Sequence, residues 1–111
     1  MSLGSNVQRV YVTQQRVREL FNAGRYWTRA RSGEFSLDYI YNKPAPPQAG
    51  QSPGTRSQII AYLNSNGEQI ALVHQYLRPD GTLGGSGRPD PKLLLQGEIL
   101  YQIDYGDIDL T

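Results

Sequence analysis

The chain of 111 residues has no cysteine and a single histidine. The missing cysteines exclude a disulfide scaffold, a thiolate metal site and a thiol nucleophile, and one imidazole excludes any site that needs two. No apolar run approaches the roughly 18 residues of a membrane helix, and no signal-peptide core follows Met1. We therefore expect a cytoplasmic protein with no membrane contact, no cofactor and no metal site.

Aliphatic and phenylalanine side chains are also few. Val, Ile, Leu and Phe make up 26 of the 111 residues, just above the roughly 20% below which chains tend to be disordered. Eight Tyr and one Trp add apolar area. The composition predicts one domain, residues 1–111, with a thin core. We expect residues 1–6 to be a flexible N-terminus and residues 104–111 to be an acidic tail.

The net charge of +1 is too small for a strongly basic nucleic-acid binder, but it hides an uneven distribution. Residues 1–58 hold eight of the 11 basic and three of the ten acidic side chains, a net charge of +5, whereas residues 59–111 carry −4. All but two of the basic residues are Arg, which suits bidentate phosphate contacts and stacking on rings. The segregation predicts a basic, partner-facing surface in the N-terminal half.

The N-terminal region has a helical pattern. Thr13 is a suitable N-cap, and apolar residues follow at helical spacing from Val17 onward. This pattern predicts a helix over residues 14–23 that ends at Gly24 in left-handed backbone. Residues 7–12 fit either a strand or an earlier helical turn.

Apolar and polar side chains then alternate on both sides of Ser32-Gly33. A two-residue turn there would pair residues 26–31 with residues 34–39 and place Arg31 opposite Glu34. One face of this hairpin would be apolar, and the other would carry an aromatic ring among arginines, which can stack single-stranded bases and hold phosphates. The candidate nucleic-acid-binding residues are Arg25, Trp27, Arg29 and Arg31. The alternative is a solvated outer face.

Asn66-Gly67 is the strongest turn signal in the chain. It predicts a hairpin of two strands, residues 57–63 and 69–77, whose register places Ile59 opposite His74. Both faces of these strands are apolar near the turn, so we expect the hairpin to lie centrally in a sheet.

Two long connections are rich in Gly and Pro, residues 42–55 and 78–97. Asp90-Pro91, within the second, has the pattern of a helix start, so we expect a short helix over 91–96 and a last strand over 98–103. Together these elements predict an α+β fold. Its N-terminal helix would pack on one face of a roughly five-stranded antiparallel sheet in hairpin order.

The second connection and the strand before it hold the candidate catalytic residues. His74 is a candidate general acid or base, Asp80 would orient it, and Arg88 would stabilise a charged phosphorus centre. The Gly-rich stretch beside them has the parts of an anion cradle built from backbone amides and a helix N-terminus. The anion-binding candidates are Arg78, Gly85, Ser86, Gly87 and Lys92. The alternatives are a structural turn and a packed histidine.

Two functions of different classes stay open. The first is a module that binds single-stranded RNA or another phosphate-bearing ligand, with metal-independent RNA cleavage at His74 as its enzymatic form. The second is a non-catalytic protein-interaction or assembly module, a homodimer included, that uses both long loops and exposed Tyr side chains. A small-molecule enzyme would need a concave, partly apolar cavity near His74.

Overall fold

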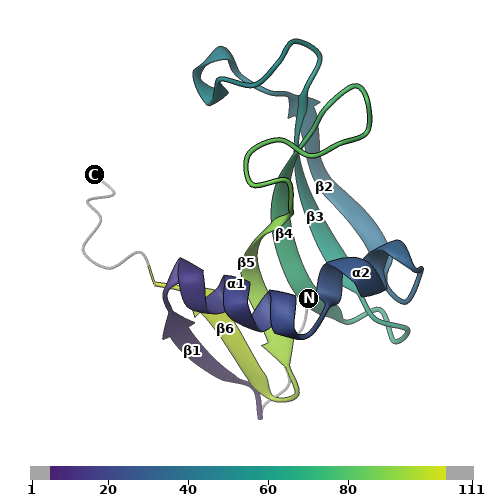
Figure 1. Cartoon of the computed structure of the whole chain (residues 1–111). Helices are drawn as coiled ribbons and strands as arrows, with labels where there is room; N and C mark the ends of the chain where they lie inside the picture. The colour runs from purple at the N-terminus through teal and green to yellow at the C-terminus, as the bar shows by residue number, and fades with distance from the viewer. Residues whose placement is uncertain (1–5, 105–111) are drawn as a thin grey trace.

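A computed structural model describes residues 6–104 of the chain, which form one mixed six-stranded sheet with two helices on one face (Figure 1). The elements in chain order are β1 (Gln8–Val12), α1 (Gln14–Ala23), α2 (Tyr26–Arg31), β2 (Ser36–Pro44), the 3-10 helix η1 (Pro47–Ala49), β3 (Arg56–Leu63), β4 (Gln69–Leu77), β5 (Asp90–Gln96) and β6 (Ile99–Ile103). The strand order is β1-β6-β5-β4-β3-β2. The predicted flexible N-terminus and acidic tail lie outside the described residues, apart from Asn6 and Asp104.

The α+β class is confirmed, and the hairpin order holds from β2 to β6. The prediction of about five strands, all antiparallel, is wrong: the sheet gains β1 and β5, loses the strand expected over residues 26–31, and is mixed because β1 pairs parallel to β6. The amide of Gln8 donates to the carbonyl of Glu98, and the amide of Asp104 donates to the carbonyl of Val12, each at 2.7 Å. This pairing joins the two ends of the described chain, so no local turn signal could predict it. None of the helices in residues 6–104 is long and apolar enough to cross a membrane.

Helix α1 has the predicted bounds. The Thr13 side chain caps it by accepting a hydrogen bond of 3.0 Å from the amide of Arg16. The left-handed end predicted at Gly24 is wrong, because Gly24 has a φ of −83° and Arg25 takes the left-handed conformation with a φ of 55°. Gly24 is needed for space instead, since a Cβ atom there would overlap the ring of Tyr26.

The predicted first hairpin is wrong, because its first strand is helix α2. Tyr26 and Ala30 are both buried against the sheet. Residues four apart share a face both in a strand and in a helix, so the alternation did not separate the two structures. Arg31 does not pair with Glu34. The Glu34 carboxylate instead forms an ion pair with Arg29, with Oε2 lying 2.6 Å from Nη2.

The central hairpin is confirmed. Strands β3 and β4 occupy interior positions of the sheet, and Ile59 lies opposite His74 as the Asn-Gly turn predicts. Ile60 and Val73 face each other on the helix side and are almost fully buried. The hairpin therefore contributes buried side chains to the core, and its register fixes the position of His74 in the sheet.

The short helix predicted after Asp90 is wrong, because residues 90–96 form the interior strand β5. Pro91 pairs with Val73 where the register between β4 and β5 shifts. A proline near the start of a strand and beside a bulge does not interrupt the hydrogen-bond ladder. Gly97, with a φ of 61°, belongs to the turn that joins β5 to β6.

The two long loops meet at one end of the central hairpin (Figure 1). A Cβ atom added at Gly54 would lie 2.9 Å from Cγ of Pro79, and one added at Gly84 would collide with the side chain of Gln51. Each loop therefore supports the other, and this contact positions the segment that follows Gly84.

Candidate functional site

A cavity of about 200 Å³ opens beside His74. The predicted site residues that line it are His74, Gly85, Ser86 and Arg88. Arg18 from α1 and Asp90 from β5 line it too, although neither was predicted for this site. The volume lies below the roughly 300–1,000 Å³ of small-molecule pockets but suits a group the size of a phosphate.

The imidazole of His74 is held from several sides. Its Nε2 atom lies 2.8 Å from the hydroxyl oxygen of Ser57, and the ring packs edge-on against Tyr76 with centroids 4.7 Å apart. Burial lowers the pKa of His74, the charge of Lys92 lowers it further, and Asp90 opposes the shift. The side chain is therefore neutral at neutral pH, which is the form that a general base requires.

The carboxylate of Asp90 collects three donors. Nε2 of Gln14 and Nζ of Lys92 donate to Oδ2 at 2.8 and 2.9 Å, and Nε of Arg18 donates to Oδ1 at 3.0 Å. Burial raises the pKa of Asp90, but these donors outweigh it and hold the pKa below its ordinary value. Asp90 is also the β5 residue opposite His74. It is therefore an ionised carboxylate next to the imidazole, and it balances part of the charge of Arg18 and Lys92.

Asp80 and Arg78 lie in a turn over residues 78–82 and make hydrogen bonds within that turn. Oδ1 of Asp80 accepts hydrogen bonds from the amide and the hydroxyl of Thr82 at 2.9 and 2.6 Å, and the Arg78 amide donates to the Thr82 carbonyl. Neither Asp80 nor Arg78 is among the described residues that line the His74 cavity. The carboxylate nearest to His74 along the sheet is therefore Asp90, whose charge acts on the imidazole.

The Gly-rich segment turns back toward His74. The amide of Gly84 donates to the carbonyl of Tyr76 at 2.8 Å, and that of Gly87 donates to Gly84 at 3.2 Å. Gly85 and Ser86 line the cavity, and within residues 6–104 their amides have no such backbone partner. No helix N-terminus adds to this cradle, because β5 follows it. Two backbone amides without a backbone partner therefore lie in the segment that borders the cavity.

A second hollow, of about 250 Å³, centres on Trp27. The guanidinium carbons of Arg31 and Arg88 lie 4.1 and 6.0 Å from the centre of its ring. Arg25 lines the same hollow, and no acidic side chain does so among the described residues. An aromatic ring among exposed cations is the arrangement that holds an unpaired base and its phosphates.

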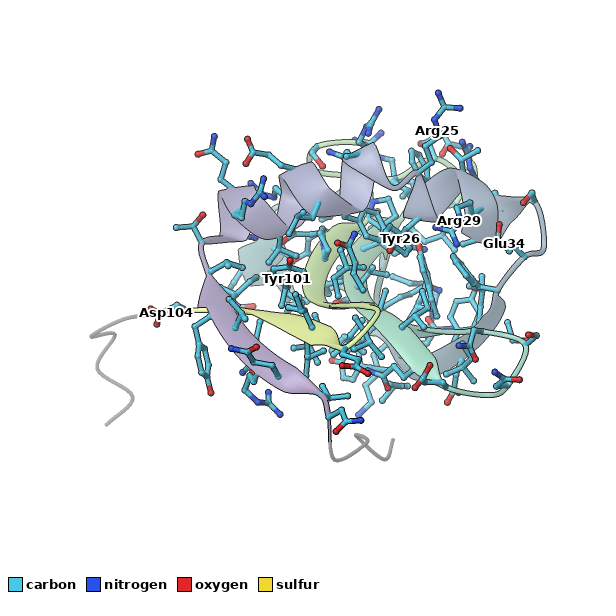
Figure 2. All side chains as sticks on the ribbon, turned by 90° about the horizontal axis from the view of Figure 1, so that it is seen from below. Arg25, Tyr26, Arg29, Glu34, Tyr101 and Asp104 are labelled. Atoms are coloured by element: carbon cyan, nitrogen blue, oxygen red, sulfur yellow. The ribbon has the colours of Figure 1, made fainter. Side chains whose placement is uncertain are left out.

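The structure does not bring Arg29 to this hollow. Its guanidinium pairs with Glu34 and lies 4.8 Å from the ring centres of both Tyr26 and Phe35. The hydrogen bond to Glu34 raises the pKa of Arg29 and lowers that of Glu34. Figure 2 shows Arg25 pointing outward from the helical layer while Arg29 lies beside Glu34.

Arg88 joins the two hollows, because it lines both of them. The charged side chains that line the two hollows are the cations Arg18, Arg25, Arg31 and Arg88 and the single carboxylate Asp90. We call this continuous basic region the Trp27–His74 surface. Its residues come from α1, α2, β4, the Gly-rich loop and β5, so only the folded chain assembles it.

A larger cavity, of about 480 Å³, lies between α2 and the turns β3–β4 and β5–β6. Its apolar walls include Tyr26, Phe35 and Ile70, and it shares no lining residue with the His74 cavity. The pair formed by Arg29 and Glu34 is the only charged feature among its lining residues. The cavity therefore has the size of a ligand site but not a set of catalytic groups.

Within residues 6–104, no group of three acidic or histidine side chains is placed to hold a metal ion. Among the described residues, the groups that line the two hollows are cations, one carboxylate, aromatic rings, the Gly-rich backbone and one imidazole. Comparison of the chain with models of protein families, with curated proteins and with solved structures gives no match.

Proposed function

We propose that the protein binds single-stranded RNA, or another ligand that carries phosphates, on the Trp27–His74 surface. The observation that carries this proposal is the double role of Arg88, which links a ring flanked by arginines to a polar cavity of phosphate size. A nucleotide offers both parts in sequence, a flat base and a charged phosphate. Because Arg88 lines both hollows, a base in the Trp27 hollow and a phosphate in the His74 cavity would lie on either side of it.

The Trp27 ring is the base platform. Arg31 covers one part of it at 4.1 Å, while Arg88 stands off at 6.0 Å, so the Arg88 side is the more open approach. An unpaired base can stack there and keep a guanidinium on its outer face. Duplex bases are already stacked on their neighbours, so this platform favours single strands.

The His74 cavity is the phosphate subsite. Arg18 and Arg88 supply guanidinium donors, and Gly85 and Ser86 supply backbone amides. Asp90 lowers the positive potential of the cavity but does not neutralise it, because this one carboxylate pairs with two cations, Arg18 and Lys92. The subsite would therefore hold a phosphate diester with a modest affinity that depends on salt.

Binding is tested by fluorescence anisotropy with a labelled oligouridylate of about 12 nucleotides at about 50 and 200 mM salt. With three or four phosphate contacts, affinity should fall roughly 20- to 50-fold over this range, since each contact contributes a log–log slope of about −0.7. Trp27→Ala should weaken binding by about 5- to 150-fold through loss of stacking. Arg16→Gln is the matched control, because Arg16 is exposed on α1 and lines neither hollow. No binding at the lower salt concentration would refute the proposal.

RNA cleavage is the enzymatic form of the same proposal. Neutral His74 would take the proton of a ribose 2′-hydroxyl, whose oxygen attacks the adjacent phosphorus and displaces the 5′-oxygen. The 5′-oxygen would take its proton from water, and His74 would afterwards return its own proton to solvent. The products would be a 2′,3′-cyclic phosphate end and a 5′-hydroxyl end. Such ends should form from RNA but not from DNA, and His74→Ala should abolish them. RNA binding without cleavage would support the binding module and refute the nuclease.

A further inference from the structure

Strand β2 forms one edge of the sheet, with its outer side unpaired (Figure 1). All nine of its residues are exposed. Four of the five large hydrophobic side chains that stand exposed in the described chain belong to it: Leu37 at 40%, Tyr39 at 50%, Ile40 at 58% and Tyr41 at 38%. A long, apolar, unpaired edge is a template for another strand.

We propose that β2 pairs antiparallel with β2 of a second copy of the chain, so that two sheets join into one across a two-fold axis. Identical edges can pair in this way because a two-fold interface uses the same patch on both subunits. The axis stands perpendicular to the sheet, so both helical layers lie on the same side. This inference does not rest on RNA binding, although it would place two Trp27–His74 surfaces on one side.

Charge complementarity selects the second copy as the occupant. An axis between Ile40 and Tyr41 puts Asp38 opposite Lys43 of the other copy, and symmetry repeats this pair. Asp38 makes no ion pair within residues 6–104, and Lys43 only approaches the Tyr41 ring at 5.5 Å. Both charges are therefore free for a partner strand, and opposite charges across antiparallel strands favour pairing.

The bulge in β2 makes this pairing geometrically consistent. Asp38 and Lys43 are five residues apart, so a regular strand would place them on opposite faces. The register shift at Ile40 changes this, since Asp38 lies opposite Ala61 and Lys43 lies opposite Ser57 on β3. Ala61 and Ser57 share one face of the regular strand β3, so Asp38 and Lys43 also share a face and can meet across the axis.

Charges, bulges and proline on an edge strand usually prevent pairing, and β2 has all three. Here the charges differ in sign and are placed symmetrically, so they select one register. Moving the axis by one residue toward the N-terminus would set Asp38 opposite Tyr41 and Lys43 opposite Ser36, so neither charge would meet an opposite charge. The bulges of the two strands face each other, so neither strand has an excess residue, and Pro44 lies at the end of the paired region.

The test is the mass in solution, measured by sedimentation equilibrium from about 10 to 300 µM, a range that captures the weak affinity of a small interface. The full chain should approach twice 12.4 kDa at the high end. Asp38→Lys and Lys43→Asp should each stay monomeric, because each creates two like-charge pairs across the axis. Circular dichroism checks that these variants, changed only at exposed positions, remain folded.

Mixing the two single variants is the decisive arm. Asp38→Lys in one chain and Lys43→Asp in the other restore opposite charges at both pairs, so the equimolar mixture should dimerise. The double variant D38K/K43D should dimerise on its own for the same reason. A wild type that stays monomeric at the highest concentration overturns the inference. So do single variants that still dimerise, or a mixture that stays monomeric.

Discussion

The guanidinium carbon of Arg31 lies 4.1 Å from the centre of the Trp27 ring, one helical turn away along α2. Arg29 lies between them in sequence but faces Glu34 and the rings of Tyr26 and Phe35. In a strand all three odd-numbered side chains would share a face. The helix therefore places Arg29 and Arg31 on different faces, whereas the alternating pattern predicted the same face for both.

The separation predicts opposite effects of two matched substitutions. Arg31→Gln should weaken binding of the labelled oligouridylate several-fold and leave the free energy of unfolding nearly unchanged, because its side chain is exposed. Arg29→Gln should lower the free energy of unfolding by about 1 kcal/mol through lost ring and ion-pair contacts and leave RNA affinity unchanged. Anisotropy and urea denaturation measure the two effects. Equal losses of RNA affinity in both variants would contradict the assignment.

Local signals predicted the elements whose structure is decided locally. The Asn66-Gly67 turn predicts the register of β3 against β4 from the pair Tyr62–Ala71 outward, which includes Ile59 opposite His74. Next to the turn a bulge pairs Leu63 with Gln69, which the turn signal did not predict. The N-cap Thr13 likewise marks the start of α1. Both predictions needed information from neighbouring residues only.

Tertiary contacts decided the rest. The pattern around Tyr26 and Ala30 fits a helix and a strand equally, and packing against the sheet selects the helix. His74 and Arg88 come from one segment of the sequence and were both predicted as site residues, but the sequence left open whether they meet. Arg18 and Asp90 were missed because their contact joins positions 72 residues apart, on α1 and β5. No spacing rule spans such a separation.

The environment of His74 predicts how stability depends on pH. Burial, and then the charge of Lys92, lower the pKa of His74 from its ordinary value of 6.5. The unfolded chain therefore binds this proton more readily than the folded chain, so the free energy of unfolding should decrease as the pH falls below 6.5. His74→Gln keeps a polar group for Ser57 but cannot titrate, so it should flatten this part of the profile. Urea denaturation across this pH range gives the comparison, and parallel profiles for the two proteins would contradict the prediction.

Asp90 should affect stability and binding in opposite directions. Asp90→Asn removes the carboxylate that pairs with Arg18 and Lys92, so we expect a loss of about 1 kcal/mol in the free energy of unfolding, as for partly exposed pairs. The same change frees Arg18, which lines the His74 cavity, and Lys92, whose charge acts on His74. RNA affinity should therefore rise several-fold at low salt, with a steeper salt dependence. Weaker RNA binding by a folded Asp90→Asn variant would place the phosphate elsewhere.

Gly24 gives a test of packing in which backbone and side-chain effects have opposite signs. With a φ of −83°, Gly24 has a backbone that alanine adopts freely, and loss of glycine flexibility alone would stabilise the protein by up to about 1 kcal/mol. The added Cβ would overlap Cε2 of Tyr26 and lie 2.9 Å from its Cδ2. The Tyr26 ring cannot easily move aside, because it stacks on Phe21 and Phe35 with centroids 5.8 and 6.1 Å away.

We therefore expect Gly24→Ala to lower the free energy of unfolding by about 1–3 kcal/mol, as overpacking does. In a Tyr26→Ala background the ring is gone, so the same substitution should become neutral or stabilising. Urea denaturation of the four proteins closes this double-mutant cycle and isolates the Gly24–Tyr26 contact. Equal destabilisation in both backgrounds would place the constraint in the backbone turn between α1 and α2 instead of in the ring.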